Sequence, residues 1–369
     1  MTGPRLAKIR VAVVFGGRSS EHSISCLSAA NILEALDRDK YEVVAIGITR
    51  KGSWHHVSDN ADDWRRDGVT LPSVVGEGPR AVLAPGVDGD HIVDHGHEVA
   101  GLISADVVFP VLHGPFGEDG TIQGALEMAA MPYVGSGVLA SAATMDKQVT
   151  KVLLAGAGLP VGGYVAVSDN EWFCQRDEVL ARVRELRFPV FVKPARAGSS
   201  MGITKVHEPS AVLAAIEAAR ELDRKIIIEE SIEGAREIEC GVLASRGHLP
   251  PRASNCAEII VGGDHEFYDF AAKYLDDSAR LSVPADIPQQ LHQELGALAV
   301  TAFDALGCDG LARVDFFLAP DGAIYINEVN TMPGFTAISM FPRMWQSSGI
   351  EYPALVDELI CLALDRVRS

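Results

Sequence analysis

The sequence has few cysteines and few basic residues. Its six cysteines are scattered without a C-x-x-C pair, so they indicate neither a zinc site nor a disulfide framework, and we expect reduced thiols. Lysine and arginine number 32 against 50 acidic residues, which gives a formal net charge of −18. This charge argues against binding to nucleic acid or to an anionic membrane, since both need a basic surface. A local basic pocket is still compatible with it.

Long apolar runs are also missing. No run approaches the roughly 18 apolar residues of a membrane span. The apolar run nearest the start covers only residues 9–15 and lacks the small-residue cleavage site of a secretory signal. The chain contains no G-x-x-x-x-G-K-[ST] sequence, so it is not a P-loop protein. We therefore expect a cytoplasmic protein that makes no use of a membrane.

The residues that are present predict a folded α/β protein. The chain has 369 residues, 47% hydrophobic and 22% charged, which predicts two or three domains. Residues 1–138 alternate strand-like and helix-like segments, a pattern typical of a parallel sheet with crossover helices. Between them, the polar residues 56–100 predict loops with short hairpins. One long helix is expected over 139–155, and later strands are expected at 163–167, 189–195, 202–207, 225–231, 236–244, 255–261, 310–319 and 323–330.

A cluster of hard oxygen donors is predicted near the end of the chain. Glu328 and Asn330, two residues apart in the strand "YINEVN", point to the same face. The Asp321-Gly322 turn predicts a hairpin that pairs this strand with "ARVDFF", which carries Asp315 and Arg313. The pair alone could be a strand end capped by solvated polar groups. Three oxygen donors on adjacent strands beside an arginine instead favour a Mg²⁺ site.

A nucleotide site is the second prediction. In "VKPARAGSSMGITKV", Lys193 ends a strand, and the Gly/Ser-rich loop 198–202 connects it to another strand. Such a loop can cover phosphates with its backbone N–H groups, with a strand lysine as a point charge. Lys147 is a candidate second phosphate lysine, and Glu229 with Glu230 ends a strand suited to adenine and ribose. Each feature alone also fits a plain hairpin loop or solvated charges.

Two rival sites are disfavoured by their context. "GSSMG" matches the G-x-S-x-G nucleophile elbow, with Ser200 as the nucleophile, but that elbow needs a helix directly after the serine. Here a strand pattern follows, so a serine hydrolase is not expected. His91, His95 and His97 suggest a metal site, but they occupy a polar loop without supporting acids.

Further candidates lie in two early loops and one late loop. "FGGRSSEHS" places Glu21 at the start of a helix, where it could be a plain helix-end acid or meet a substrate ammonium group. "LHGPFGEDG" places His113 at the end of the third strand, and both loops are expected at the same edge of the sheet. The aperiodic segment 264–284, with Lys273 and Tyr274, predicts a lid that closes over a site.

The complete set of motifs resembles one family. "FGGRSSEHSIS", "LHGPFGEDGTIQG", "MDK", "VFVKPARAGSSMGI", "AAKYL", "ARVDFF" and "INEVNTMPGFT" have the order and spacing of D-alanine–D-alanine ligases over essentially the whole chain. The resemblance implies an ATP-grasp fold of three α/β domains, 1–138, 139–232 and 233–369, with ATP between the central and C-terminal domains. It also implies ligation of two D-alanines through an acyl phosphate, for peptidoglycan precursors.

The resemblance assigns roles to individual residues. It implies that Asp315, Glu328 and Asn330 ligate Mg²⁺. It implies that ATP is bound by Lys147, Lys193, Ser200, Glu229, Glu230, Ile232, Glu237 and Lys273. The implied catalytic residues are Glu21, Ser199, Tyr274, Arg313, Gly334 and His113. The implied contacts to the two D-alanines are Glu21, His113, Lys273, Arg313, Ser339 and Met340.

The same resemblance implies ATP with two Mg²⁺ ions as cofactors, Mn²⁺ as a substitute, a monovalent cation such as K⁺, and a homodimer. Two positions depart from the family pattern: Ala197 stands where many relatives have Glu, and Met340 where Leu is frequent. A D-alanine–D-lactate ligase is the main alternative, although such relatives tend to have His where this chain has Tyr274. A regulatory ATP-binding module without catalysis is the alternative from a different class.

Overall fold

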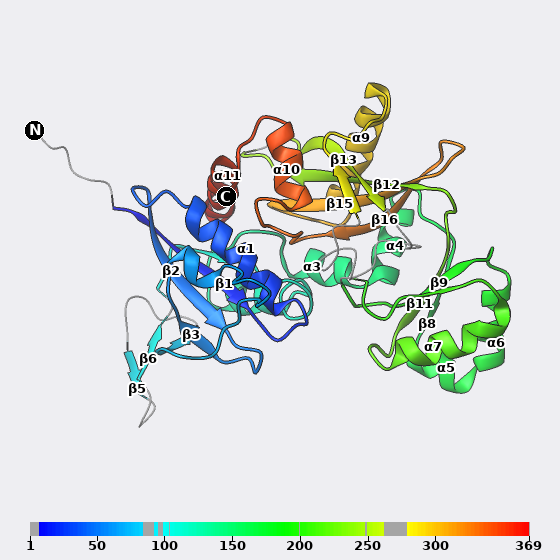
Figure 1. Cartoon of the computed structure of the whole chain (residues 1–369), viewed down its shortest axis with the longest axis horizontal. Helices are drawn as coiled ribbons and strands as arrows, with labels where there is room; N and C mark the ends of the chain where they lie inside the picture. Colours follow the sequence, from blue (N-terminus) through cyan, green and yellow to red (C-terminus); the bar gives the residue numbers. More distant parts are fainter. Residues whose placement is uncertain are drawn as a thin grey trace, which may run out of the picture.

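The computed structural model describes residues 7–83, 92–94, 99–102, 104–198, 200–247, 249–261 and 279–368. These residues form three β-sheets, with helices packed against them (Figure 1). No helix in this part of the chain is both long enough and apolar enough to cross a membrane. The α/β prediction is therefore confirmed at the level of the elements.

The first sheet has the strand order β5-β6-β4-β3-β2-β1-β7. Its centre is parallel, because β1 pairs in parallel with both β2 and β7, as the alternating pattern predicts. Toward the other edge β3 runs antiparallel to β2, so the sheet as a whole is mixed. The elements are β1 (Ile9–Gly16), α1 (His22–Ala35), β2 (Tyr41–Ile48), β3 (Trp54–His56), η1 (Ala61–Trp64), β4 (Arg80–Val82), β5 (Ile92–Asp94), β6 (Val99–Leu102), β7 (Val107–Pro110) and α2 (Thr121–Met128).

The second sheet is antiparallel, with the order β10-β9-β11-β8. Its elements are β8 (Tyr164–Val167), α5 (Asp169–Cys174), α6 (Arg176–Arg184), β9 (Val190–Pro194), β10 (Thr204–Val206), η2 (Pro209–Ala211), α7 (Val212–Arg220) and β11 (Ile226–Glu230). Helices α5 and α6 were not predicted from the sequence. Ser168 and Glu171 form a reciprocal capping box at the start of α5, so a sequence signal for this helix was present.

The third sheet has the order β14-β13-β12-β15-β16. The predicted hairpin is confirmed, since β15 and β16 pair antiparallel through the Asp321-Gly322 turn. The described part of the segment that was expected to be irregular includes one more strand, β14. The elements are β12 (Arg236–Leu243), β13 (Arg252–Val261), β14 (Ala279–Ser282), α9 (Gln289–Ala305), β15 (Leu311–Leu318), β16 (Ile324–Asn330), α10 (Met340–Ser347) and α11 (Tyr352–Arg368).

The prediction of a single helix over 139–155 is wrong. Two helices, α3 (Val138–Met145) and α4 (Lys147–Gly156), meet at Asp146, whose backbone is extended. The Asp146 side chain accepts a hydrogen bond from the Val149 N–H, which caps α4, and it also binds Lys225 at 2.8 Å. The propensity of the segment is helical throughout, but the cap and the ion pair stabilise the break. Lys147 thereby becomes the first residue of α4.

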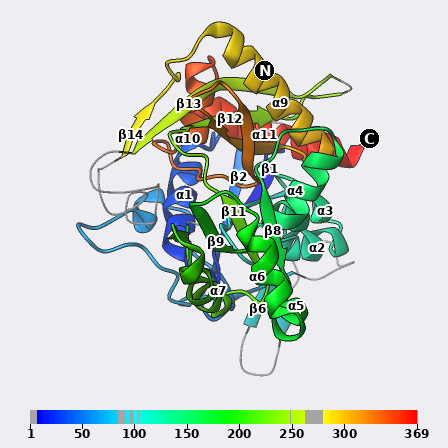
Figure 2. The ribbon, with the colours of Figure 1, turned by 90° about the vertical axis from the view of Figure 1, so that its right-hand side faces the viewer.

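The largest hydrophobic core joins the two ends of the chain. Phe109 on β7 and Tyr352 on α11 both pack on Phe335, with ring centroids 5.9 and 5.7 Å away. In Figure 1, α11 lies beside α1, in agreement with the contacts between these helices. The second and third sheets are joined by a bridge between Val161 and Ile326, and Figure 2 shows β8, β9 and β11 below β12 and β13. The three sheets are thus held around a shared centre.

Candidate active site

A cavity of about 850 Å³ lies where the three sheets meet. Every sequence-predicted site residue that the structure describes lines it: Glu21, His113, Lys147, Lys193, Ser200, Glu229, Glu230, Ile232, Glu237, Arg313, Asp315, Glu328, Asn330, Gly334, Ser339 and Met340. Ser199, Lys273 and Tyr274 lie outside the described residues, as do His91, His95 and His97. Residues from positions 21 to 340 therefore converge on one cavity.

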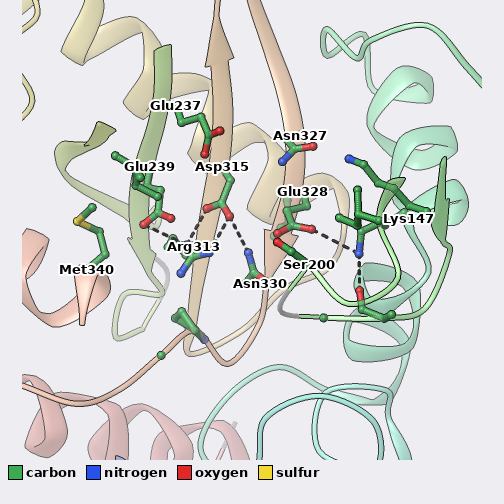
Figure 3. Close-up of a pocket in the computed structure, with 18 of the residues that line it drawn as sticks. Lys147, Ser200, Glu237, Glu239, Arg313, Asp315, Asn327, Glu328, Asn330 and Met340 are labelled. Carbon is green, nitrogen blue, oxygen red and sulfur yellow. Dashed lines mark hydrogen bonds and ion pairs between the residues drawn. The ribbon is translucent and has the colours of Figure 1, made fainter. Parts of the chain in front are cut away.

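The predicted oxygen donors meet on the β15–β16 hairpin (Figure 3). Asp315 and Glu328 are direct cross-strand partners, and a register shift follows Asp315. The Asn330 amide donates a hydrogen bond of 3.0 Å to Asp315 Oδ2. Arg313 donates from Nε and Nη2 to the two oxygens of Asp315, each at 2.7 Å. Asp315 is thus held at the cavity wall by Arg313 and Asn330, with Glu328 beside it.

These donors fit a Mg²⁺ site that a nucleotide completes. Among the described residues there is no group of three or more His, Cys, Asp or Glu side chains able to hold a metal ion by themselves. Magnesium, however, is usually bound by one or two carboxylates together with substrate phosphates. Asp315 and Glu328 supply that number of carboxylates, and Asn330 adds an amide oxygen. The oxygen chemistry is that of a hard cation.

Arg313 lies between acids on two strands. Its Nε is 3.3 Å from Glu239 Oε2 on β12, in addition to its two contacts with Asp315. Burial alone would lower the pKa of Arg313, but Asp315 and Glu239 outweigh it and raise the pKa well above its usual value. The guanidinium therefore stays charged, and it presents a fixed positive charge to the cavity (Figure 3). Glu239 was not predicted from the sequence, although it lies two residues after Glu237 and therefore on the same face of β12.

Lys147 connects the Gly-rich loop to the acid pair. Its Nζ donates to the backbone oxygen of Ala197 at 2.8 Å and lies 3.5 Å from Glu328 Oε2. Its own N–H donates to the Ala195 oxygen at 3.0 Å. Ser200, in the same loop, has a φ of +56° and borders the cavity. The loop that departs from the family pattern at Ala197 is thus anchored through a backbone oxygen, which any residue at this position would provide.

Lys193 is bound to an acid that the sequence analysis placed near the nucleoside. Its Nζ lies 2.7 Å from Glu229 Oε2, and Lys151 Nζ lies 2.7 Å from Glu229 Oε1. Burial alone would raise the pKa of Glu229, but the two lysines lower it far below its usual range. Glu229 is therefore ionised and has both oxygens occupied. Lys151 lines the cavity and was missed by the sequence analysis, although it lies one turn after Lys147.

Glu230 is turned toward a different partner. Arg187 binds it through Nε at 3.0 Å, Nη2 at 2.8 Å and the backbone N–H at 2.9 Å. Ile232 and Glu237 border the same part of the cavity, next to the end of β11. This region combines an apolar side chain with acceptors, as a base and a ribose require.

Glu21 is held between two glycines at the start of α1. A Cβ atom on Gly114 would lie 2.7 Å from Glu21 Oε2, and one on Gly198 would lie 3.1 Å from the same oxygen. Gly114 has a φ of +73°, which side-chain-bearing residues rarely adopt. The carboxylate therefore touches both the turn after β7 and the Gly-rich loop. Both early loops open at the same edge of the sheet, as predicted.

His113 is buried and neutral. Its Nδ1 faces the Met332 backbone oxygen at 3.2 Å and therefore carries the proton, whereas Nε2 accepts from the Ser28 hydroxyl at 3.0 Å. Burial lowers the pKa of His113. Since Met332 follows β16, this histidine also ties the first sheet to the third.

Glu118 is a third residue of the cavity whose role was not predicted from the sequence. It is partly buried near Glu21, and its Oε2 accepts a hydrogen bond of 2.6 Å from the Gly114 N–H. Burial, followed by the charge of Glu21, raises the pKa of Glu118 to about 8. Its side chain is therefore mostly protonated at neutral pH. A "GEDG" turn gives no local sign of this, because the shift depends on burial and on Glu21, which lies nearly 100 residues earlier in the chain.

One wall of the cavity is formed by residues that come after β16 in the chain. Gly334 lies against Ser339, whose Oγ would be 3.2 Å from a Cβ at Gly334. The Ser339 hydroxyl accepts from the Thr336 N–H at 3.1 Å and lies 2.7 Å from Thr336 Oγ1. Met340, the first residue of α10, is largely buried next to it. After the Pro333-Gly334 break the chain thus folds back on itself between Gly334 and Ser339.

Comparisons with known proteins identify the family. Residues 10–136 match the family described as "D-ala D-ala ligase N-terminus", and residues 153–361 match "D-ala D-ala ligase C-terminus". The chain belongs to the D-alanine–D-alanine ligase family. The recognised motifs therefore predicted the family correctly.

Relatives of this ligase family match nearly the whole chain. A D-alanine–D-alanine ligase of an Arthrobacter species is 55% identical, covering 99% of this chain and 96% of that protein. The enzyme of the same name from Mycolicibacterium gilvum is 53% identical, with 98% of each chain covered.

Solved structures confirm the ATP-grasp fold of the ligase family. The VanG D-Ala:D-Ser ligase from Enterococcus faecalis superposes with a TM-score of 0.81 at 36% identity, covering 97% of this chain and all of that one. The D-alanine–D-alanine ligase from Coxiella burnetii superposes with a TM-score of 0.79 at 34% identity, covering 98% of this chain and 95% of that one. The domain boundaries and the roles of individual residues stay predictions.

Proposed function

We propose that the protein ligates two D-alanines to D-alanyl-D-alanine, with ATP converted to ADP and phosphate, for peptidoglycan precursors. One observation carries the proposal: the acid pair Asp315 and Glu328 shares a cavity with the lysines Lys147 and Lys193. A carboxylate is a poor electrophile, and transfer of a phosphoryl group activates it as an acyl phosphate. The charge of that transfer needs cations on several sides, and this cavity supplies them.

ATP occupies the part of the cavity between the second and third sheets in this proposal. Lys147 and Lys193 bind its phosphates beneath the Gly-rich loop, and Ile232 and Glu237 border the nucleoside. Asp315, Glu328 and Asn330 hold Mg²⁺, which would neutralise charge on the transferring phosphoryl group. Two Mg²⁺ ions, replacement by Mn²⁺ and assistance by a monovalent cation such as K⁺ are further parts of the proposal.

The first D-alanine binds at the edge of the first sheet. Glu21 accepts a hydrogen bond from its ammonium group, and the carboxylate of the substrate points toward Arg313 and the transferred phosphate. His113, which is neutral and held by Met332, shapes this pocket without adding a charge. The close packing of Glu21 on Gly114 and Gly198 supports the assignment, because it fixes the carboxylate at the cavity wall.

The second D-alanine attacks the acyl phosphate through its deprotonated amine. The Arg313 guanidinium and the Gly334 N–H stabilise the oxyanion of the tetrahedral intermediate. Ser339 and Met340 border the carboxylate and methyl group of the second substrate. Lys273 is proposed to bind near the same carboxylate. Ser199 and Tyr274 complete the proposal as partners of Glu21 and as part of a lid that excludes water.

Two alternatives differ only in the second substrate. A D-alanine–D-lactate ligase was the alternative from the sequence, and the likeness to a D-Ala:D-Ser ligase adds D-serine. The relatives that are 51–55% identical are all named D-alanine–D-alanine ligases, which favours the dipeptide.

The test measures phosphate release from ATP and Mg²⁺ with D-alanine, with D-alanine plus D-lactate or D-serine, and with L-alanine as a control. We expect turnover with D-alanine alone and identification of D-alanyl-D-alanine by mass spectrometry. Folded protein without D-alanine-dependent turnover would overturn the proposal, and a mixed product in excess of the dipeptide would favour an alternative. A cytoplasmic homodimer is also proposed, and sedimentation equilibrium checks the dimer.

A further inference from the structure

Glu229 binds two lysines at once. Lys151 Nζ lies 2.7 Å from one carboxylate oxygen and Lys193 Nζ lies 2.7 Å from the other. The three side chains are buried, with 8% of Glu229, 4% of Lys151 and 11% of Lys193 exposed. An arrangement of one acid and two bases at this depth carries a net positive charge next to the cavity.

The three residues come from elements with different constraints. Lys193 is on β9 and Glu229 on the neighbouring strand β11, so sheet pairing sets their separation. Lys151 is on α4, one turn after Lys147, and α4 is fixed by the Asp146 cap and by the bond from the Lys147 N–H to Ala195. Lys151 therefore approaches Glu229 from a helix outside the sheet, whereas Lys193 approaches it from within the sheet.

In the proposed function, nucleotide binding would remove one of the two counter-ions of Glu229. Lys193 must turn its ammonium group toward a phosphate, and its flexible four-carbon side chain permits that movement. Glu229 is then separated from one of its two counter-ions while it stays buried. A buried carboxylate without a counter-ion is strongly unfavourable, so the movement of Lys193 would be opposed unless another cation stays in place.

We propose that Lys151 is a positioning residue for nucleotide binding, which holds Glu229 as a carboxylate so that Lys193 can exchange that partner for a phosphate. The inference rests on the proposed function, because it takes Lys193 as a phosphate-binding lysine. Lys147 has a different task, since its ammonium group contacts the Gly-rich loop and Glu328. One turn of α4 thus supplies two lysines with separate roles.

The experiment measures binding of the β,γ-imido analogue of ATP, with Mg²⁺ and without D-alanine, to the full chain by isothermal titration calorimetry. We expect Lys151→Met to weaken binding on the order of 30-fold or more, because Lys193 then stays with Glu229. Lys151→Arg keeps the charge and should recover most of the affinity. Thermal unfolding of each variant shows whether it is folded.

The double variant Lys151→Met with Glu229→Gln separates charge compensation from packing. A neutral amide neither retains Lys193 nor needs a counter-ion, so the double variant should bind the analogue within about threefold of Glu229→Gln alone, a difference well below tenfold. If Lys151→Met acted only by disturbing the packing, it would weaken binding as much in the Glu229→Gln variant as in the unsubstituted chain. That result would overturn the inference.

A matched control removes a lysine that pairs with an acid away from the cavity. Lys40 binds Asp357 between the first sheet and α11, and Lys40→Met should leave the affinity for the analogue unchanged. Unchanged affinity in Lys151→Met itself would overturn the inference while the proposed function stands. No binding to the unsubstituted chain would instead overturn the proposed function, and the inference with it.

Discussion

Lys147 Nζ lies 3.5 Å from Glu328 Oε2, which links the first turn of α4 to the last strand of the third sheet. The contact brings a phosphate lysine and a metal acid of the proposal to the same point. It depends on the break at Asp146, because that break makes Lys147 the first residue of α4. The position of the helix end therefore bears directly on the site.

Glu328→Gln is expected to lower turnover by on the order of a hundredfold or more, since an amide replaces a charged oxygen ligand of Mg²⁺. Phosphate release with saturating D-alanine measures the effect, and Mn²⁺ binding in the presence of ATP, followed by electron paramagnetic resonance, gives a second readout. The far-ultraviolet circular dichroism should be unchanged. Near-normal turnover together with normal Mn²⁺ binding would refute the metal role.

Arg313→Met is expected to destabilise the fold by roughly 3–5 kcal/mol, because it removes the cation shared by the buried Glu239 and the largely buried Asp315. Urea denaturation measures the free energy of unfolding. Arg313→Lys should lower the free energy of unfolding by less, since it keeps the charge but not the bidentate geometry.

The control for Arg313 is Arg246→Met. Arg246 forms an ion pair with Asp365 at the surface, and its loss should leave the free energy of unfolding almost unchanged. Equal effects of Arg246→Met and Arg313→Met would contradict the special role of burial at Arg313.

Glu118 predicts a pH dependence of stability. Burial, and then Glu21, raises its pKa from 4.5 to about 8, so between these values the folded chain keeps a proton that the unfolded chain has lost. The contribution of Glu118 to stability is therefore greatest below about pH 4.5 and declines as the pH rises toward about 8. Glu118→Gln keeps an acceptor for the Gly114 N–H and cannot ionise.

The melting temperatures of the Glu118→Gln variant and the unsubstituted chain should accordingly diverge with rising pH. We expect the free energy of unfolding of the variant to increase by up to a few kcal/mol relative to that of the unsubstituted chain between pH 5 and pH 8, with no further increase above pH 8. A difference that is constant from pH 5 to pH 9 would show that Glu118 titrates normally.

Gly114→Ala is expected to raise the KM for the first D-alanine. The new Cβ would lie 2.7 Å from Glu21 Oε2 and would displace the carboxylate, at a backbone φ of +73°. Gly68→Ala is the control, because Gly68 also has a positive φ of +55° but nothing lies within 4 Å of its Cβ position. Initial rates at varied D-alanine concentration separate the two. Equal KM values for both variants would mean that only backbone strain matters.

Local sequence determined much of this structure. The buried run of β1 and the β15–β16 hairpin could be predicted, because side-chain alternation and an Asp-Gly turn act within a few residues. The same alternation placed Glu328 and Asn330 on one face, and the motif order predicted the family. These features need no knowledge of distant residues.

The tertiary structure alone decided which charges meet. Asp146 ends a helix that propensity would continue, because Lys225 binds it from 79 residues away. Glu229 lies between Lys151 and Lys193, and Glu118 keeps its proton beside Glu21. Ion pairs and desolvation depend on distances between elements from different sheets, and a sequence pattern carries local periodicity but not those distances.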